Sequence, residues 1–221
     1  QLVRSHVPDI IVSDVMMPRM NGYELCKTIK EDIAISHIPV ILLTAKDDKQ
    51  SLISGYKNGA DGYLSKPFEV EMLMELIRNR LKNREYTKKR YLNAGLIPTP
   101  EESTISLTDE TFLIKLNSII QENIDNTNLG IQFICQEVGL GRSSLYNKLK
   151  ALTGMGANEY ISKLRIEKAI TLISGTDMPF SEIAEKTGFT TPSYFSTTFK
   201  QYTGETPSQY KERKKKGLTD Q

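Results

Sequence analysis

The sequence predicts a chain of two parts, an α/β domain followed by an all-α domain. Residues 1–82 contain three short apolar runs, and the segments between them have apolar residues at helical spacing. From Leu107 to about Lys211 only helical spacing is found, without any alternating strand pattern. A chain of 221 residues is long enough for two small domains.

Three runs in the first part, residues 9–13, 39–44 and 62–65, are predicted to be strands of a parallel sheet. Continuous β-branched runs fit strands that are buried on both faces, and each crossover is long enough for a βαβ unit. The helices are predicted from apolar stripes, which consist of Tyr23, Cys26 and Ile29, then Leu52, Ile53 and Tyr56, and after Pro67 Met72, Leu73, Leu76, Ile77 and Leu81.

Residues 83–106 are predicted to form a partly extended linker, because a charged stretch is followed there by Pro98 and Pro100 with little apolar pattern. The all-α domain covers residues 107–213, with Thr108 as the predicted cap of its first helix. Residues 214–221 are expected to be a basic, solvated tail.

The composition excludes several classes of protein. With 38% hydrophobic and 25% charged residues the chain has enough apolar surface for a core, and no apolar run approaches the 18 residues of a membrane span. Cys26 and Cys135 lie far apart, so neither a disulfide framework nor a zinc site is expected, and a cytoplasmic location is the default. The net charge of +2 does not by itself indicate a nucleic-acid partner.

Each predicted strand ends near a residue that suits phosphoryl chemistry. Asp14 follows the first strand, Thr44 ends the second, and Lys66 follows the third directly before Pro67. In an open parallel sheet the carboxyl ends of the strands share one edge. A carboxylate there can act as a nucleophile, while a hydroxyl and an ammonium can bind phosphate oxygens. An aspartate that only caps a turn is the alternative interpretation of Asp14.

Residues 1–82 resemble the C-terminal two thirds of a response-regulator receiver domain. Three strings carry the resemblance in order, residues 8–18 with Asn21-Gly22, residues 41–45, and residues 59–68. It implies a partial flavodoxin-like, doubly wound parallel fold with a cis Lys66–Pro67 bond. By this resemblance Asp14 is the phosphoacceptor, and Thr44 and Lys66 are the switch residues. Tyr63 is the aromatic residue whose rotamer follows Thr44. Asp14 and the backbone carbonyl of Met16 are the implied Mg²⁺ ligands.

The sequence departs from the receiver pattern at its start. A receiver has a strand, a helix and a second strand before this point, and its first strand ends in the acidic pair that holds Mg²⁺. Asp14 and the Met16 carbonyl alone make a poor octahedral site. We therefore expect a fragment of a longer natural protein that holds no Mg²⁺ by itself. Such a truncation cannot be phosphorylated, and a sheet that a partner copy completes or rearranges is the alternative.

Two segments of the all-α domain, residues 131–150 and 180–200, share one pattern. Each has a short helix, a turn that begins with Gly139 or Gly188, and a second helix. A glycine at this position suits a left-handed backbone after a helix. A longer helix around residues 159–169 separates the two segments. The pattern predicts two helix-turn-helix units, whose second helices enter the DNA major groove.

Residues 107–213 closely resemble the AraC-type DNA-binding domain. The strings are residues 160–165, 183–184 with 188–189, 193–195, 199–200 and 204–207. The family reads successive major grooves of double-stranded DNA, about 34 Å apart. The resemblance implies base contacts by Ser143, Tyr146, Asn147, Ser193, Ser196 and Thr197, and phosphate contacts by Arg142, Lys148 and Lys200. Arg165 is expected to be structural or to face a phosphate.

Together the two resemblances imply a two-component transcription regulator, not an enzyme, in which phosphorylation from a histidine kinase controls DNA binding. Receivers commonly pair through their later helices and strands, here about Lys46–Tyr63, so a homodimer is expected. Residues 84–103 and the output domain also resemble the C-terminal end of hybrid two-component systems, in which a sensor, a kinase and the regulator form one chain, here expected to be anchored in the inner membrane. A stand-alone regulator that is cut at its N-terminus fits equally. A dimerising scaffold that is never phosphorylated and a protein-interaction module are the alternatives.

Overall fold

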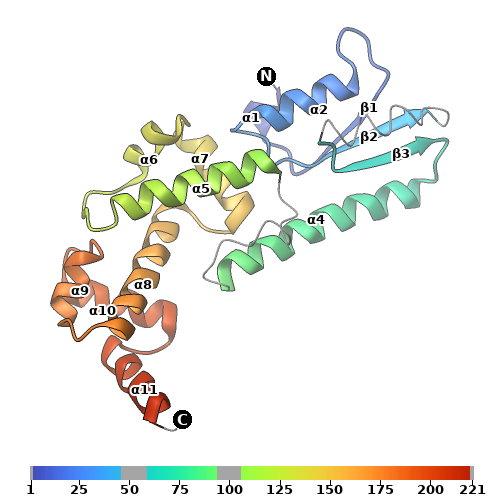
Figure 1. Ribbon diagram of the computed structural model, residues 1–221. Helices are drawn as coiled ribbons and strands as arrows, with labels where there is room; N and C mark the ends of the chain where they lie inside the picture. Colours follow the sequence, from blue (N-terminus) through green and yellow to red (C-terminus); the bar gives the residue numbers. More distant parts are fainter. Residues whose placement is uncertain (1, 46–58, 94–105, 220–221) are drawn as a thin grey trace. The chain divides into compact units, whose positions relative to one another are not determined.

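The computed structural model describes residues 2–45, 59–93 and 106–219 (Figure 1). Internal contacts divide the chain into two compact units. The first unit consists of residues 1–114 and 140–155, and the second of residues 115–139 and 156–221. The predicted helix with Leu52, Ile53 and Tyr56, and most of the predicted dimer segment, lie outside the described residues.

The first unit contains the predicted parallel sheet. Its strands are β1 (Ile11–Asp14), β2 (Val40–Ala45) and β3 (Gly62–Lys66), in the order β1-β2-β3. Both pairs are parallel, and Figure 1 shows the three arrows running in the same direction. Two helices accompany the sheet, the short α1 (Leu2–His6) and α2 (Gly22–Glu31). The three predicted strands and their parallel arrangement are therefore confirmed.

The central strand β2 begins with four apolar residues in a row, and its position in the middle of the sheet explains this. Val40, Ile41 and Leu42 are completely buried, because β2 has a strand on each side and side chains pack on both of its faces. One face packs against α2 in a cluster that consists of Val15, Cys26, Ile29, Ile35, Ile38, Val40 and Leu42. The predicted helical stripe of α2 thus supplies two of the buried side chains of this core.

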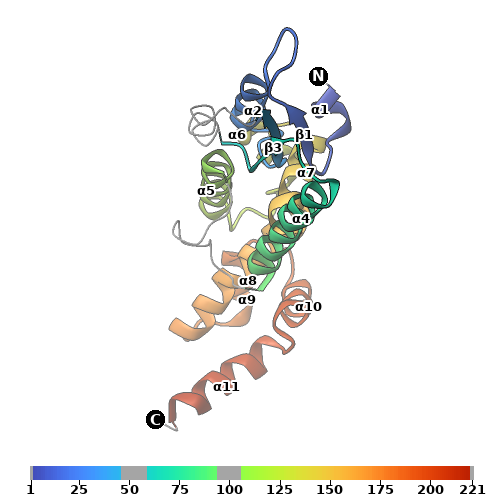
Figure 2. The same cartoon turned by 90° about the vertical axis from the view of Figure 1, so that its right-hand side faces the viewer.

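The predicted linker begins too early, because helix α4 runs from Val70 to Asn93. Residues 83–93 contain no glycine or proline, and five of the eleven are Arg, Lys or Glu, which favour helices. An ion pair between Lys88 and Glu85 lies along this extension. Helix α4 packs against α7 (Arg142–Thr153), as Figure 2 shows. The rest of the predicted linker, residues 94–105, lies outside the described residues.

The remaining described elements are helices. They are α5 (Leu107–Glu122), α6 (Ile131–Val138), α8 (Ala157–Gly175), α9 (Phe180–Lys186), α10 (Pro192–Thr203) and α11 (Pro207–Thr219). The predicted cap at Thr108 is wrong, because the backbone N–H of Asp109 donates to the hydroxyl of Ser106, one residue before α5 begins. The predicted tail is also more ordered than expected, since α11 continues through its basic residues to Thr219.

The second unit is organised around α8. Helices α9, α10 and α11 all contact α8. The core of this group consists of Ile166, Ala169, Ile173, Ile183, Ala184, Phe189, Phe195 and Phe199. Among the described helices none is both long enough and apolar enough to cross a membrane.

Candidate functional site

The sheet brings the three predicted phosphoryl-binding residues to one edge. Asp14 is the last residue of β1, Lys66 is the last residue of β3, and Thr44 lies near the end of β2 between them. The ammonium of Lys66 contacts the carboxylate of Asp14 directly. Both side chains keep more than a third of their surface exposed, whereas Thr44 is almost fully buried. A group that approaches this edge from solvent can therefore reach Asp14 and Lys66.

The surroundings of Asp14 keep its carboxylate charged. The hydrogen bond from Lys66 lowers the pKa of Asp14, and the backbone N–H of Met16 lowers it further. That N–H donates to Asp14 Oδ1 at 3.1 Å. A carboxylate must be ionised to act as a nucleophile, so the local geometry provides the reactive form at neutral pH.

The loop after Asp14 is shaped by the Asn21-Gly22 pair. The side chain of Asn21 accepts from the backbone N–H of Glu24, and the Glu24 carboxylate accepts from the backbone N–H of Asn21. The backbone N–H of Gly22 donates to the carbonyl of Val15 at 2.9 Å. The start of α2 is thereby fixed against the end of β1, and this contact positions the Asp14 loop.

One further feature of this edge matches an expectation from the sequence. The bond between Lys66 and Pro67 is cis, as the receiver resemblance implied. Tyr63, in β3, is half-buried and packs against the apolar cluster between α2 and the sheet.

Helix α10, the predicted recognition helix of the second unit, is capped at both ends. The Thr191 hydroxyl caps it by accepting from the backbone N–H of Tyr194, Pro192 is its first residue, and Gly204 ends it in the left-handed region. Phe195 and Phe199 are buried in the core, as expected. The candidate DNA contacts of α10 lie on the accessible side, with Ser193, Thr197 and Lys200 exposed and Ser196 partly exposed.

The predicted recognition helix α7 presents most of its candidates to solvent but not all. Arg142, Ser143 and Tyr146 are exposed, and Asn147 is partly exposed. Lys148 is completely buried. It follows Leu145 by three residues, which places it on the inner face of the helix. The expected contact between Lys148 and a DNA phosphate does not fit this position.

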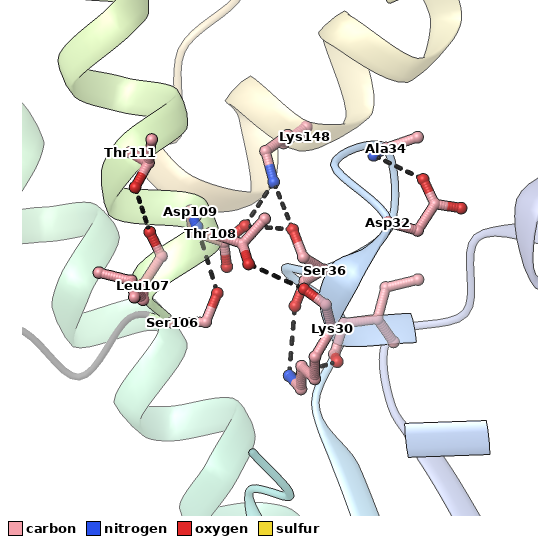
Figure 3. Close-up of polar contacts among 11 residues, drawn as sticks. Lys30, Asp32, Ala34, Ser36, Ser106, Leu107, Thr108, Asp109, Thr111 and Lys148 are labelled. Carbon is pink, nitrogen blue, oxygen red and sulfur yellow. Dashed lines mark hydrogen bonds and ion pairs between the residues drawn. The ribbon is translucent and has the colours of Figure 1, made fainter. Parts of the chain in front are cut away.

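Lys148 instead belongs to a buried polar cluster, which we call the Ser36–Asp109–Lys148 cluster (Figure 3). Its ammonium pairs with the carboxylate of Asp109 and donates to the hydroxyl of Ser36 at 2.8 Å. The Ser36 hydroxyl donates to the same carboxylate at 2.6 Å. Neither Ser36 nor Asp109 was predicted from the sequence to be a site residue. The one available signal was the inward position of Lys148, which calls for a buried acidic partner.

Comparisons with known proteins agree with both halves of this description. The family model of the response regulator receiver domain matches residues 1–78, and the model of a helix-turn-helix domain matches residues 134–213. A probable transcriptional regulator, ycf29 of Pyropia yezoensis, is 32% identical over 162 residues, which cover 68% of this chain and 73% of that protein. The chain belongs to the response-regulator family. Its output domain is of the AraC type, as its two helix-turn-helix units and their connecting helix indicate.

Another relative of this response regulator is much longer than the chain. Histidine kinase P4 of Formosa agariphila is 42% identical over 213 residues, which are 96% of this chain but only 16% of that protein. Among solved structures, the C-terminal domain of AraT, a response regulator from Geobacillus stearothermophilus, is 29% identical. It matches 50% of this chain and 88% of its own with a TM-score of 0.45.

Response regulators generally use Mg²⁺ for phosphorylation. In this chain the ion would need oxygen ligands at the edge of the sheet around Asp14. Of the expected ligands, the described residues include the carboxylate of Asp14 and the backbone carbonyl of Met16. They contain no group of three or more His, Cys, Asp or Glu side chains that could hold a metal ion. One carboxylate and one carbonyl leave most of the octahedral positions to oxygens from elsewhere. The described residues alone therefore do not form a complete Mg²⁺ site, and we assign no step to the ion.

Arg165 in α8 of this response regulator has a structural position. Its side chain is mostly buried, and it donates to the backbone carbonyls of Ile124 at 3.3 Å and Asn126 at 2.7 Å. Its guanidinium lies 6.0 Å from the ring centre of Phe189. This geometry favours the structural role that was expected for Arg165 over the role of facing a phosphate.

Proposed function

We propose that this response regulator is the regulatory end of a hybrid two-component protein, in which phosphorylation of Asp14 controls DNA binding by α7 and α10. The contact between Asp14 and Lys66 beside Thr44 is the observation that supports a phosphoryl site. The match along 96% of this chain to a protein called a histidine kinase supports a hybrid parent. This proposal makes the chain a regulator and leaves kinase chemistry to the rest of the parent.

The proposed reaction at Asp14 is the transfer of a phosphoryl group from a phosphohistidine to the aspartate. A carboxylate oxygen of Asp14 attacks the phosphorus of a phosphohistidine, so that a new O–P bond forms while the N–P bond breaks and the imidazole leaves. Lys66 then exchanges its ion pair with the carboxylate for contacts with the phosphoryl oxygens, which an ammonium binds well. The hydroxyl of Thr44 is the group between them that senses the phosphoryl group, and Tyr63 adjusts with it.

The output is binding to double-stranded DNA through two adjacent major grooves. The exposed basic residues Arg142 and Lys200 contact phosphates and position the protein. The base edges are contacted by polar residues on the accessible faces of the two helices, namely Ser143, Tyr146, Asn147, Ser193, Ser196 and Thr197. An asparagine can read adenine with two hydrogen bonds, whereas serine and threonine are less selective. The proposal therefore places most of the sequence specificity in α7.

Three further parts of the proposal concern the whole protein. It acts as a homodimer on the cytoplasmic side of a membrane-anchored parent, with residues 46–63 as the pairing segment. Its phosphodonor is a histidine kinase. In the complete receiver, Mg²⁺ receives its remaining acidic ligands from outside the described residues, beside Asp14 and the Met16 carbonyl.

Phosphate transfer to the full natural protein tests this function. With a purified histidine kinase and radiolabelled ATP, we expect label on the wild type that is lost in Asp14→Asn. The matched control is Asp9→Asn, because Asp9 is an exposed carboxylate at the opposite end of β1. Equal labelling of the wild type and Asp14→Asn would overturn the assignment of the phosphoacceptor.

A receiver-derived scaffold that is never phosphorylated is the second candidate function. It is favoured by one observation, that the described residues contain no group of three or more His, Cys, Asp or Glu side chains that could hold a metal ion. The same labelling experiment separates the two functions. A full natural protein that binds DNA as a dimer but never takes up label would support the scaffold.

A further inference from the structure

We propose that the Ser36–Asp109–Lys148 cluster couples the receiver to DNA reading by fixing helix α7 to the receiver segment. This inference rests on the proposed function and names the contact through which the phosphorylation state reaches α7. The cluster joins three segments that are distant in the sequence, namely the loop before β2, the start of α5 and the middle of α7.

The hydrogen bonds of the cluster form a closed network. A serine hydroxyl has one hydrogen to donate and lone pairs to accept. Ser36 uses the hydrogen for Asp109 and accepts from Lys148, while Lys148 also pairs with Asp109. Side chains of all three residues are almost completely excluded from solvent. Each residue thus depends on the other two to satisfy its polar atoms.

Because the network is buried, its hydrogen bonds and ion pair hold α7 in place. Burial lowers the pKa of Lys148, and the Asp109 carboxylate opposes that effect. A buried ammonium or carboxylate that loses its partner is strongly destabilised. Partial separation is therefore unfavourable, and the receiver segment and α7 are either joined here or released to water. A contact with two such states can transmit a signal.

A second set of contacts fixes the Ser36 loop to the sheet and to α2. The ammonium of Lys30, in the last turn of α2, donates to the carbonyls of Ser36 at 3.2 Å and Ile38 at 3.0 Å. It also pairs with Asp61, just before β3, at 2.8 Å. The Thr108 hydroxyl donates to the carbonyl of Lys30 at 2.9 Å, as Figure 3 shows. The end of α2 is thus joined both to the cluster and to α5.

Helix α2 connects the cluster to the phosphoacceptor. Its first residue, Gly22, is hydrogen-bonded to Val15, directly after Asp14, and Lys30 lies near its last residue. A ten-residue α-helix is a stiff element about 15 Å long. A shift of the Asp14 loop on phosphorylation would displace α2 as a unit and strain the contacts of Ser36. We infer that this displacement releases or retightens the cluster.

The test compares DNA affinity with and without phosphate on Asp14 in the full natural protein. The affinity is measured by fluorescence anisotropy on a duplex selected from random sequences. Two changes break the cluster, Ser36→Ala on the receiver side and the combined replacement Lys148→Met with Asp109→Leu. Ser118→Ala is the control, because Ser118 is an exposed serine of α5 that bonds only within its helix.

We expect both cluster variants to bind DNA and to take up phosphate, while the ratio of the two affinities falls at least threefold toward one. Ser118→Ala should keep the wild-type ratio. Allosteric couplings of about 5–150-fold leave room for this loss to be measured. A wild-type ratio in Ser36→Ala would overturn the proposal.

Hydrogen exchange separates a failure of this inference from a failure of the proposed function. In the unphosphorylated protein, Ser36→Ala should speed amide exchange in α7 and in the first turn of α5, compared with Ser118→Ala. This readout does not require Asp14 to accept phosphate. Unchanged exchange in both helices would overturn the inference, even for a protein in which Asp14 is readily phosphorylated.

Discussion

A side chain at Gly22 would collide with the backbone at Asp14. A Cβ atom there would lie 2.5 Å from the Asp14 carbonyl oxygen and 2.9 Å from the Cα of Val15. We predict that Gly22→Ala lowers the free energy of unfolding by about 1–3 kcal/mol, because backbone must shift to make room. Urea denaturation measures the change. The same shift moves the Asp14 loop, so labelling of Asp14 should also slow.

The control for this prediction is Gly175→Ala. A Cβ at Gly175, the last residue of α8, would meet nothing within 4 Å. Alanine favours a helix over glycine by about 1 kcal/mol, so this change should be neutral or stabilising. Equal destabilisation by the two substitutions would show that the close approach at Gly22 is not the cause.

The turns of the two helix-turn-helix units differ in how much space surrounds their glycines. Gly139 and Gly188 both have left-handed φ angles, 71° and 70°. A Cβ at Gly188 would collide with the carbonyl oxygen of Ile124 and lie 2.7 Å from Arg165 Nη2, whereas a Cβ at Gly139 would meet nothing within 4 Å. We predict that Gly139→Ala costs about 1 kcal/mol of stability from backbone strain alone. Gly188→Ala should cost at least twice as much, because the collision adds to the strain. Similar thermal stabilities of the two variants would contradict this difference.

His37 should make the stability of the protein depend on pH. Burial, followed by the charge of Lys148, lowers the pKa of His37 to about 3. The unfolded chain binds a proton at this residue near pH 6.5, but the folded chain does not. The contribution of His37 to the free energy of unfolding is therefore constant above about pH 6.5. It is lost as the pH falls toward 3, by up to about 1.4 kcal/mol per pH unit.

The measurement is urea denaturation of the wild type and His37→Gln at pH 7.5, 6 and 5. The difference between the two proteins isolates His37, since the other titrating groups are shared. We expect the wild type to lose more stability than His37→Gln as the pH falls. Parallel losses in the two proteins would show that His37 is protonated equally in the folded and unfolded states.

Lys200 should contribute to DNA affinity but not to sequence preference. Its exposed ammonium in the last turn of α10 is expected to contact a phosphate. Lys200→Ala should weaken binding to all duplexes alike and reduce the slope of log K against log salt by about one. Lys168→Ala, which removes an exposed lysine of α8, is the control and should leave the slope unchanged. A change of sequence preference in Lys200→Ala would contradict the assignment.

Much of the sheet and its edge could be predicted because the signals are local. Continuous apolar runs indicate buried parallel strands, and parallel strands place their carboxyl ends together, so Asp14, Thr44 and Lys66 could be assigned to one edge. Gly139 and Gly188 were predictable for the same reason, since a left-handed turn after a helix favours glycine.

The cluster around Lys148 could not be predicted, because its partners are distant in the sequence. Helical spacing alone places Lys148 beside Leu145, three residues earlier, on the inner face of α7. It does not say that the compensating groups are Asp109, 39 residues away, and Ser36, 112 residues away. The extent of α4 was missed for another reason, since its charged extension resembles a linker in composition but favours a helix in propensity.

The central claim is that phosphate on Asp14 controls DNA binding, and the most direct measurement is the DNA affinity of the full natural protein before and after phosphorylation. It is made on the wild type and on Asp14→Asn, with a duplex selected from random sequences. We predict an affinity change of at least fivefold in the wild type and none in Asp14→Asn. Equal affinities of the phosphorylated and unphosphorylated wild type, with label confirmed on Asp14, would contradict the claim.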